Sequence, residues 1–492
     1  MDNRELYFLS AAELAPLIRK RTVSPVDIVK AHLERIEALN DALRAYLYIA
    51  GDQALAAARA AEIDIMAGGY RGPLHGIPVA YKDIYNVAGM PTTAASKVMA
   101  GYLAEEDCTV AARLRRAGAI CLGKLNTHEF ASGSMEVFGT ARNPWNTAMV
   151  PGGSSSGSGT ALAAHLVTGA TGSDTGGSVR NPASFCGIVG LKPTYGRISR
   201  AGIIPLSWSL DHAGPMARTV TDTALLLQAI AGPDRRDASA STQPVLDYQA
   251  ALRADLQGIR IGVPRTYFFE GGDPEVIAAV RAAIDAMRQS GAAIRQIDLP
   301  HAWLGPAASW AIAYTESFAF HRANFFARPR DYTPAFFHKI AGAAFLTAEE
   351  RITAQRLRQV ITMEFVEALQ GVDAIVVPTT AYPAFPIGHA SPQADMRSLT
   401  RSVSLTGLPA LAVPCGFTAA GLPVSMQVIG RAWEEATVLG VGYAYEQGAG
   451  WYQRRAPIKP GPIPSASAAM PVSASMLPVV MLIVSIVSAG DT

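Results

Sequence analysis

Three short stretches of the sequence carry residues suited to acyl-transfer chemistry. Lys82 ends the apolar run 77–81, residues 152–159 are rich in glycine and serine, and residues 172–180 place two glycines directly before Ser178. A serine hydroxyl becomes a nucleophile when a base removes its proton, and a lysine withdrawn from water can be that base because desolvation disfavours the ammonium form. A lysine at the end of an apolar strand is more often an ordinary surface residue than a catalytic one, so the catalytic interpretation of Lys82 depends on the residues around it.

The glycine pair before Ser178 indicates a tight turn that could stabilise an oxyanion. Glycine lets the backbone turn so that successive N–H groups point at one place. The amides of Thr175, Gly176, Gly177 and Ser178 could hold the negative oxygen of a tetrahedral intermediate, an effect of about 3–4 kcal/mol per donor. A purely structural turn fits this segment equally well.

The glycine- and serine-rich run 152–159 has three competing interpretations. A flexible linker is disfavoured because the apolar, helix-forming segment 161–167 follows directly. A phosphate-binding loop is disfavoured because the lysine of the G-x-x-x-x-G-K-[ST] pattern is absent. Residues 153–157 match the G-x-S-x-G nucleophile elbow, which would make Ser155 the nucleophile, but no histidine of the chain lies in a recognisable catalytic context.

The elements that must position these residues are predicted from the pattern of apolar side chains. Ser10 with Glu13, and Ser24 before a proline, mark the starts of two N-terminal helices. Further strands are predicted at 77–81, 119–122, 260–263, 294–299, 374–377 and 410–413, and helices at 110–117, 275–289 and 434–446. This alternation predicts an α/β fold with a central mixed sheet flanked by helices.

The composition excludes several classes of protein. Lys and Arg exceed Asp and Glu by 42 − 40 = 2, so nothing indicates a nucleic-acid-binding surface, and a small neutral substrate is expected. The four cysteines show neither metal-ligand spacing nor the density of a disulfide scaffold, so reduced, buried thiols are expected. The charged N-terminus lacks the features of a signal peptide, which indicates a cytoplasmic location.

Two further segments leave alternatives open. The uncharged segment 470–489 approaches the ~20 residues of a membrane-spanning helix, but its prolines and serines favour a partly ordered tail or an interface segment over an anchor. An aromatic segment could line a substrate pocket, although its helical spacing favours core packing; it contains Trp310, Tyr314, Phe318, Phe320, Phe325 and Phe326.

Together the three chemical stretches resemble the amidase signature family. The serine- and glycine-rich signature appears at 152–159, the stretches 172–180 and 182–194 follow, and the two key serines are 178 − 154 = 24 residues apart, as in the family. Residues 76–83 resemble the family's lysine strand, with Tyr81 in place of a commoner aliphatic residue. Four shorter stretches extend the likeness: 142–146, 209–211, 407–410 and 421–424.

The resemblance implies a Ser–cis-Ser–Lys triad on a mixed sheet with helices on both faces. Lys82 would be the base, Ser154 the proton relay after a cis Gly153–Ser154 bond, and Ser178 the nucleophile. No metal or organic cofactor would be required. The supporting hydrogen-bond shell would consist of Ser155, Asp174 and Arg180.

Within the family, a stand-alone amidase is the favoured interpretation. It would cleave a carboxylic amide through an acyl-enzyme on Ser178, chemistry that also allows ester or carbamate hydrolysis. The alternative is the glutamine-hydrolysing subunit of a tRNA-dependent amidotransferase; the arginine pair and Leu-Gly-Thr pattern with which such subunits bind glutamine is not found, and the region 334–370 looks like the free-standing enzymes. A non-catalytic binding scaffold is the lesser alternative, because all three triad positions are filled.

The expected partners and domains follow from this interpretation. The partner is expected to be a small-molecule amide, with no nucleic acid and no membrane, and a homodimer is compatible. The expected domain organisation is one amidase domain over 1–463, with N-terminal helices at 8–65, a catalytic core at 70–225, a substrate-side helical region at 265–370 and a C-terminal sheet completion at 371–455, followed by an apolar tail of unknown role at 464–492.

Overall fold

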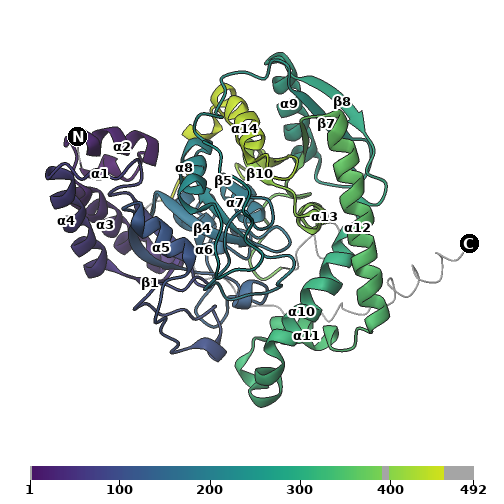
Figure 1. Cartoon of the computed structure of the whole chain (residues 1–492), viewed down its shortest axis with the longest axis horizontal. Helices are drawn as coiled ribbons and strands as arrows, with labels where there is room; N and C mark the ends of the chain where they lie inside the picture. The colour runs from purple at the N-terminus through teal and green to yellow at the C-terminus, as the bar shows by residue number, and fades with distance from the viewer. Residues whose placement is uncertain (1–2, 390–397, 459–492) are drawn as a thin grey trace, which may run out of the picture.

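One large mixed sheet organises the chain. The computed structural model describes residues 3–389 and 398–458, and it places eleven strands in the order β1-β3-β2-β4-β6-β5-β10-β11-β9-β7-β8 (Figure 1). Parallel and antiparallel pairs both occur, for example β2 with β4 and β4 with β6. The predicted fold class is therefore confirmed. The strands are β1 (Tyr46–Ile49), β2 (Pro78–Lys82), β3 (Ile120–Leu125), β4 (Gly169–Asp174), β5 (Val189–Lys192), β6 (His212–Ala217), β7 (Arg260–Pro264), β8 (Ala293–Ile297), β9 (Ala374–Pro378), β10 (Ala410–Phe417) and β11 (Pro423–Ile429).

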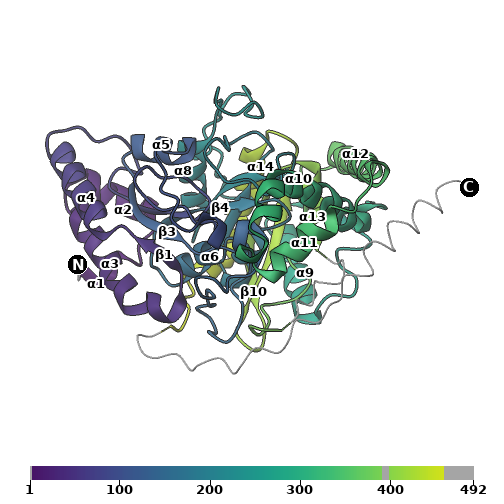
Figure 2. The same ribbon diagram turned by 90° about the horizontal axis from the view of Figure 1, so that it is seen from below.

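Helices cover both faces of the sheet. They are α1 (Asn3–Leu6), α2 (Ala11–Arg19), α3 (Pro25–Leu43), α4 (Gly51–Met66), α5 (Thr109–Arg116), α6 (Ser156–Ala163), α7 (Arg180–Cys186), α8 (Val220–Ile230), α9 (Pro274–Gln289), α10 (Gly305–Ala327), α11 (Pro334–Ala343), α12 (Ala348–Gly371), α13 (Leu399–Thr406) and α14 (Glu435–Ala449). In the views of Figures 1 and 2, α1–α4 lie at one end of the molecule and α10–α12 at the other.

Around β2 the sheet separates two hydrophobic cores, and successive residues of this strand face different cores. Val79 and Tyr81 of β2 belong to the core that contains residues of α5, α8 and α14. Ala80, between them, belongs to the core built from α3, α4, α6 and α7. This alternation is the two-residue period of a strand buried on both faces, which requires apolar side chains in both directions.

Most predicted elements are confirmed with small shifts at their ends. Ser10 and Glu13 form the expected capping box of α2, and Ser24 caps α3 before Pro25. The apolar pattern of the sequence did not predict β1, β4, β5, β6 and β11, three of which (β4, β5 and β6) lie within or shortly after the glycine- and serine-rich region of the chain.

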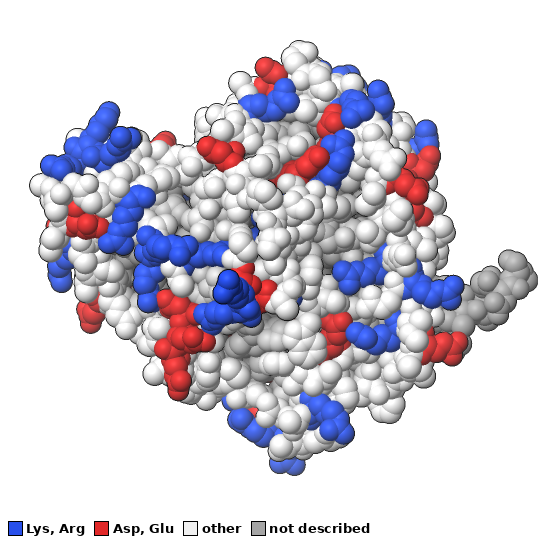
Figure 3. Space-filling view, in the orientation of Figure 1, with Lys and Arg blue, Asp and Glu red and all other residues white. Residues whose placement is uncertain are grey.

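Three further features of the described residues are the length and polarity of their helices, their possible metal ligands and their surface charges, which can be seen in Figure 3. None of their helices has both the length and the apolar character needed to span a bilayer, and they hold no cluster of three or more His, Cys, Asp or Glu side chains that could bind a metal ion. Figure 3 shows basic and acidic groups interspersed on the face it displays. The apolar segment 470–489 lies outside the described residues.

Candidate active site

Lys82 is fully buried at the end of β2, and its amine is surrounded by serine hydroxyls. Nζ lies 2.6 Å from Oγ of Ser154, 2.9 Å from Oγ of Ser173 and 3.1 Å from Oγ of Ser155. The strand is held between β3 and β4, and the backbone amide of Lys82 donates to the hydroxyl of Thr171 at 3.0 Å. Strand β2 therefore places the amine of Lys82 in contact with Ser154, the serine expected to relay protons.

The surroundings of Lys82 favour its neutral form. Burial lowers its pKa from 10.5 to about 7, although the carboxylates of Asp211 and Asp174 act in the opposite direction. An amine with this pKa is about half neutral at pH 7, so it can accept a proton. The three nearby hydroxyls stabilise the amine without supplying a negative charge.

Ser154 and Ser155 lie in the turn that begins α6. The Gly153–Ser154 peptide bond is cis, as the family resemblance implied. The Ser155 hydroxyl also accepts a hydrogen bond from the amide of Ser173 at 3.2 Å, which ties the start of α6 to β4. The run 152–159 therefore opens a helix inside the domain, as expected, and does not connect domains.

The loop after β4 presents free backbone amides beside Ser178. The amide of Gly177 donates to Oδ1 of Asp174 at 2.7 Å, so it is directed at that carboxylate. Within the described part of the chain, the amides of Thr175, Gly176 and Ser178 have no hydrogen-bond acceptor. The candidate oxyanion donors are therefore these three amides, without that of Gly177.

Ser178 is partly exposed, whereas Ser154 is buried. The backbones of the two loops meet, because the amide of Ser155 donates to the carbonyl of Ser178 at 3.2 Å. Within residues 3–389 and 398–458, the hydroxyls of Ser154 and Ser178 form no hydrogen bond with each other. Catalytic hydrogen bonds are often long without substrate and tighten when it binds.

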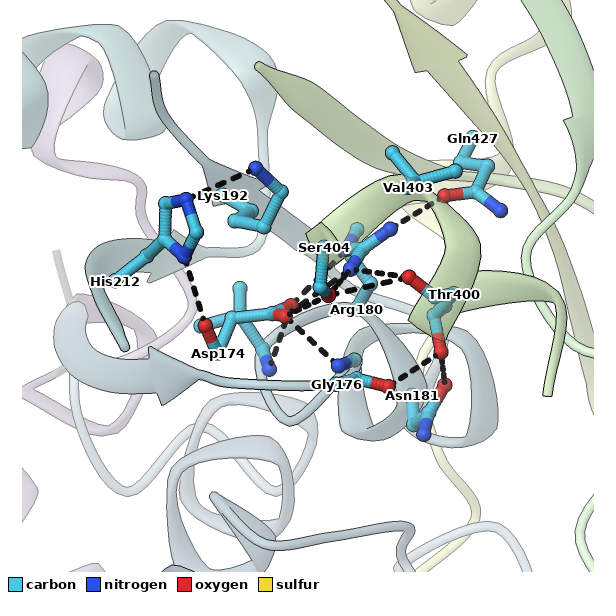
Figure 4. A network of polar contacts seen from close by, with 12 residues as sticks. Asp174, Gly176, Arg180, Asn181, Lys192, His212, Thr400, Val403, Ser404 and Gln427 are labelled. Carbon is cyan, nitrogen blue, oxygen red and sulfur yellow. Dashed lines mark hydrogen bonds and ion pairs between the residues drawn. The ribbon is translucent and has the colours of Figure 1, made fainter. Parts of the chain in front are cut away.

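A buried ion pair holds the Ser178 loop in place (Figure 4). Arg180 binds Asp174 through Nε and Nη2, each at 3.0 Å, and both side chains are fully buried. Its other hydrogen bonds include those to Oε1 of Gln427 at 2.7 Å and Oγ of Ser404 at 2.7 Å. Burial alone would raise the pKa of the Asp174 carboxyl, but attraction and hydrogen bonds from Arg180 hold it below its usual value. Arg180 thereby fastens the nucleophile loop to β11 and α13.

A second buried contact supports the end of β4. Lys192 lies 3.3 Å from Nε2 of His212, and Nδ1 of His212 lies 3.0 Å from the carbonyl of Asp174 (Figure 4). With Nδ1 facing carbonyl oxygens, it is the nitrogen that carries the proton, and Nε2 accepts from Lys192. Burial lowers the pKa of Lys192 to about 7. These two side chains touch neither Lys82 nor the two serines of the expected triad.

A cavity of about 360 Å³ opens beside the buried amine. Its lining includes Ser173, which binds Lys82, together with Asp211, Trp208 and Phe320. Phe320 is the member of the aromatic segment that lines this cavity. Tyr314 is buried, with its hydroxyl hydrogen-bonded to Ser132, as core packing predicts, whereas Phe320 and Phe326 of the same segment are exposed.

Several residues of the site are not marked by any sequence motif that would have predicted their role. Ser173 lies inside the recognised stretch 172–180 without a predicted role, and Asp211 belongs to the stretch 209–211 that only extends the family likeness. Arg401 lies against Gly176, since a Cβ added there would be 3.2 Å from its Cγ and Nη1. No short motif surrounds Arg401 that could have indicated this contact.

Comparisons with known proteins point to one family. The family model described as Amidase matches residues 27–439. A glutamyl-tRNA(Gln) amidotransferase subunit from Methylococcus capsulatus is 43% identical over 474 residues, which cover 90% of this chain and 97% of the relative. The peptide amidase of Stenotrophomonas maltophilia superposes with a TM-score of 0.81 at 34% identity, covering 91% of this chain and 98% of the other. The glutamyl-tRNA(Gln) amidotransferase subunit from Thermotoga maritima gives a TM-score of 0.74 at 32% identity, with coverages of 91% and 94%.

The comparisons correct the expected partners. A small-molecule amide as the partner, with no nucleic acid and at most a homodimer, was expected from the near-neutral charge and from the preference for a stand-alone enzyme. This expectation is wrong, because relatives 40% to 43% identical are named as subunits of an amidotransferase whose name includes glutamyl-tRNA. A net charge of +2 describes one chain and says nothing about what other subunits carry.

The matched family model spans most of the chain, and the buried amine of Lys82 contacts the hydroxyl of Ser154. This chain belongs to the amidase family, whose enzymes act on carbon–nitrogen bonds.

Proposed function

We propose that the chain hydrolyses the side-chain amide of glutamine as the amide-cleaving subunit of a tRNA-dependent amidotransferase. The observation that carries the proposal is the contact of 2.6 Å between the amine of Lys82 and the hydroxyl of Ser154, in a chain 43% identical to a subunit of that name. Burial keeps the amine partly neutral at pH 7. The amine can therefore begin a proton relay without a histidine.

The proposed mechanism begins with three side chains. Lys82 takes a proton from Ser154, Ser154 takes one from Ser178, and the oxygen of Ser178 forms a bond to the amide carbon of glutamine. The carbonyl oxygen becomes negative, and the amides of Thr175, Gly176 and Ser178 donate to it. The relay then runs backwards, so that the departing nitrogen receives the proton and leaves as ammonia.

The second half of the reaction releases the acid. The products of the first half are ammonia and a glutamyl ester on Ser178. Water gives a proton to the same relay and adds to the ester carbon, and the bond to Ser178 breaks as the serine regains its proton. The sum is glutamine plus water giving glutamate plus ammonia.

The test measures ammonia from glutamine, with the full chain alone and together with the partner subunits that purify with it. Ser178→Ala and Lys82→Met should each lower the rate by at least a thousandfold, in line with the loss of a nucleophile or its base. Ser290→Ala is the matched control, because it removes an exposed hydroxyl at the C-terminal cap of α9. Undiminished glutamine hydrolysis by Ser178→Ala would refute the assignment.

A second candidate is hydrolysis of small or peptide amides by the chain alone. The favouring observation is the superposition on the peptide amidase from Stenotrophomonas maltophilia, whose TM-score of 0.81 exceeds the 0.74 of the amidotransferase subunit from Thermotoga maritima. Release of ammonia from peptide amides without any partner subunit, and none from glutamine with partners, would select this second function.

A further inference from the structure

One cationic side chain, Arg401, lies beside the proposed oxyanion amides, and a second, Lys339, is linked to it through Tyr314. Thr400 at the start of α13 donates from Oγ1 to the carbonyl of Gly176 at 2.8 Å (Figure 4). This contact fixes the first turn of α13 against the nucleophile loop. The next residue, Arg401, consequently lies over Gly176, where an added Cβ would be 3.2 Å from its Cγ and Nη1 and 3.3 Å from its Cζ.

Lys339 of α11 reaches the same region from another direction. Its Nζ donates to the carbonyl of Ser132 at 2.6 Å and lies 5.8 Å from the centre of the Tyr314 ring. The hydroxyl of Tyr314 is hydrogen-bonded to that of Ser132. The hydroxyl of Tyr314 also interacts with the side chain of Arg401. Arg401, Tyr314, Lys339 and Ser132 therefore form one polar cluster, which we call the α11–α13 cluster.

Among the residues that the structure describes, the two cations of the α11–α13 cluster have no carboxylate beside them. Arg401 and Lys339 are both half-buried, and no acidic side chain of residues 3–389 and 398–458 lies within 4.0 Å of either. Burial would raise the pKa of the Tyr314 phenol, yet the two cations and the hydrogen bond from Ser132 lower it to about 8. Half-buried cations without counter-charges are costly unless an anion arrives to pair with them.

We propose that Arg401 and Lys339 bind a carboxylate of the amide substrate and thereby select amides that carry an acid group. Arg401 lies against Gly176, two residues before Ser178. A substrate whose amide carbon faces the hydroxyl of Ser178 could therefore place its own carboxylate at Arg401. A guanidinium offers the paired donors that match a carboxylate, and an ammonium adds a second charge. The inference deepens the proposed function, because glutamine is one member of this substrate class, and it rests on that function for the position of the amide.

The first test is binding, which needs no turnover. Calorimetric titration of the full chain with glutarate should detect binding that Arg401→Met weakens by about 10- to 100-fold, the range for a lost charge-assisted hydrogen bond. Arg401→Lys should retain part of the binding, and Lys339→Met should weaken it independently if one variant fails to fold. Arg356→Met, an exposed arginine of α12, is the matched control and should bind as the unmodified chain does.

The second test separates this inference from the proposed function. The kcat/KM of the full chain for glutaramate, which carries a carboxylate, is compared with that for pentanamide, which does not. Arg401→Met should lower kcat/KM for glutaramate by the same 10- to 100-fold and change that for pentanamide less than about threefold. If glutamine is not hydrolysed but this selective loss occurs, the substrate class stands and the glutamine proposal falls. Absence of glutarate binding, or equal losses on both amides, would overturn the inference.

Discussion

The rate of amide cleavage should depend on pH through a single group with a pKa of about 7. Lys82 must be neutral to accept a proton from Ser154, so kcat/KM should fall tenfold per pH unit below the pKa and level off above it. The burial of Lys82 sets the magnitude. A lysine with the ordinary pKa of 10.5 would be about 0.03% neutral at pH 7, whereas Lys82, with a pKa of about 7, is about half neutral. Burial therefore raises the neutral fraction about a thousandfold.

The assay is the release of ammonia at subsaturating substrate between pH 5.5 and 8.5. Asp211→Asn should move the midpoint to lower pH, because the carboxylate of Asp211 raises the pKa of Lys82 and its removal leaves burial unopposed. Asp285→Asn is the matched control, since it removes the same charge from the exposed surface of α9, and it should leave the midpoint unchanged.

Lys192 supplies the result that would refute this reasoning. Burial also lowers its pKa to about 7, but it contacts His212 and backbone carbonyls, not the serines. If Lys192→Met removes the midpoint while Lys82→Met retains it, the titrating group is Lys192 and the proposed base is wrong. Folding of each variant is checked by its unfolding transition before the profile is measured.

Three further predictions concern stability. Between about pH 7 and pH 10.5 the folded state holds fewer protons at Lys82 and at Lys192 than the unfolded state, so urea titrations should show an unfolding free energy that rises with pH there. Lys82→Met should remove only the part of this rise that comes from Lys82. Arg180→Met leaves the buried carboxylate of Asp174 without its cation and should lower the unfolding free energy by about 3–5 kcal/mol. A loss below about 1 kcal/mol would show that the ion pair between Arg180 and Asp174 does not stabilise the fold. Gly177→Ala places a Cβ 2.1 Å from Oγ1 of Thr400 at a φ of +123°, and thermal unfolding should show a larger loss than in the control Gly258→Ala, which shares a positive φ but has open space.

The sequence indicated the proposed catalytic residues more completely than strand β4, which precedes the loop of Ser178. Ser154 and Ser178 lie in stretches dense enough in glycine and serine to be recognised, Lys82 follows the apolar run 77–81, and Lys82 is in contact with Ser154. Strand β4, with the sequence GATGSD, was missed because glycine and aspartate disfavour strands. Its glycines are required by packing, since a Cβ at Gly172 would be 2.6 Å from Sδ of Met216. The strand propensities of individual residues cannot show that neighbouring strands and helices leave no room for side chains along β4.

The α11–α13 cluster could not have been found in this way. Tyr314, Lys339 and Arg401 are far apart in the chain, and none is flanked by a recognisable pattern. Helical spacing favoured core packing over a pocket for the segment that holds Tyr314, and Tyr314 is indeed buried, but spacing says nothing about the hydroxyl at its tip. The prediction of the partners was wrong for a similar reason, because the amino-acid composition of one chain says nothing about the other subunits with which it assembles.

The clamp around Asp174 links catalysis to recognition. Its carboxylate receives the amide of Gly177 and the guanidinium of Arg180, which holds the loop while other amides remain free for an oxyanion. Arg180 also donates to the carbonyl of Thr400 at 3.1 Å, on the helix that carries Arg401. The nucleophile loop and the proposed carboxylate-binding side chain are therefore parts of one hydrogen-bonded unit. Substitutions at Arg180 and Arg401 should consequently be non-additive in kcat/KM for a carboxylated amide, as expected of residues that share partners, whereas additive effects would show that the two parts act independently.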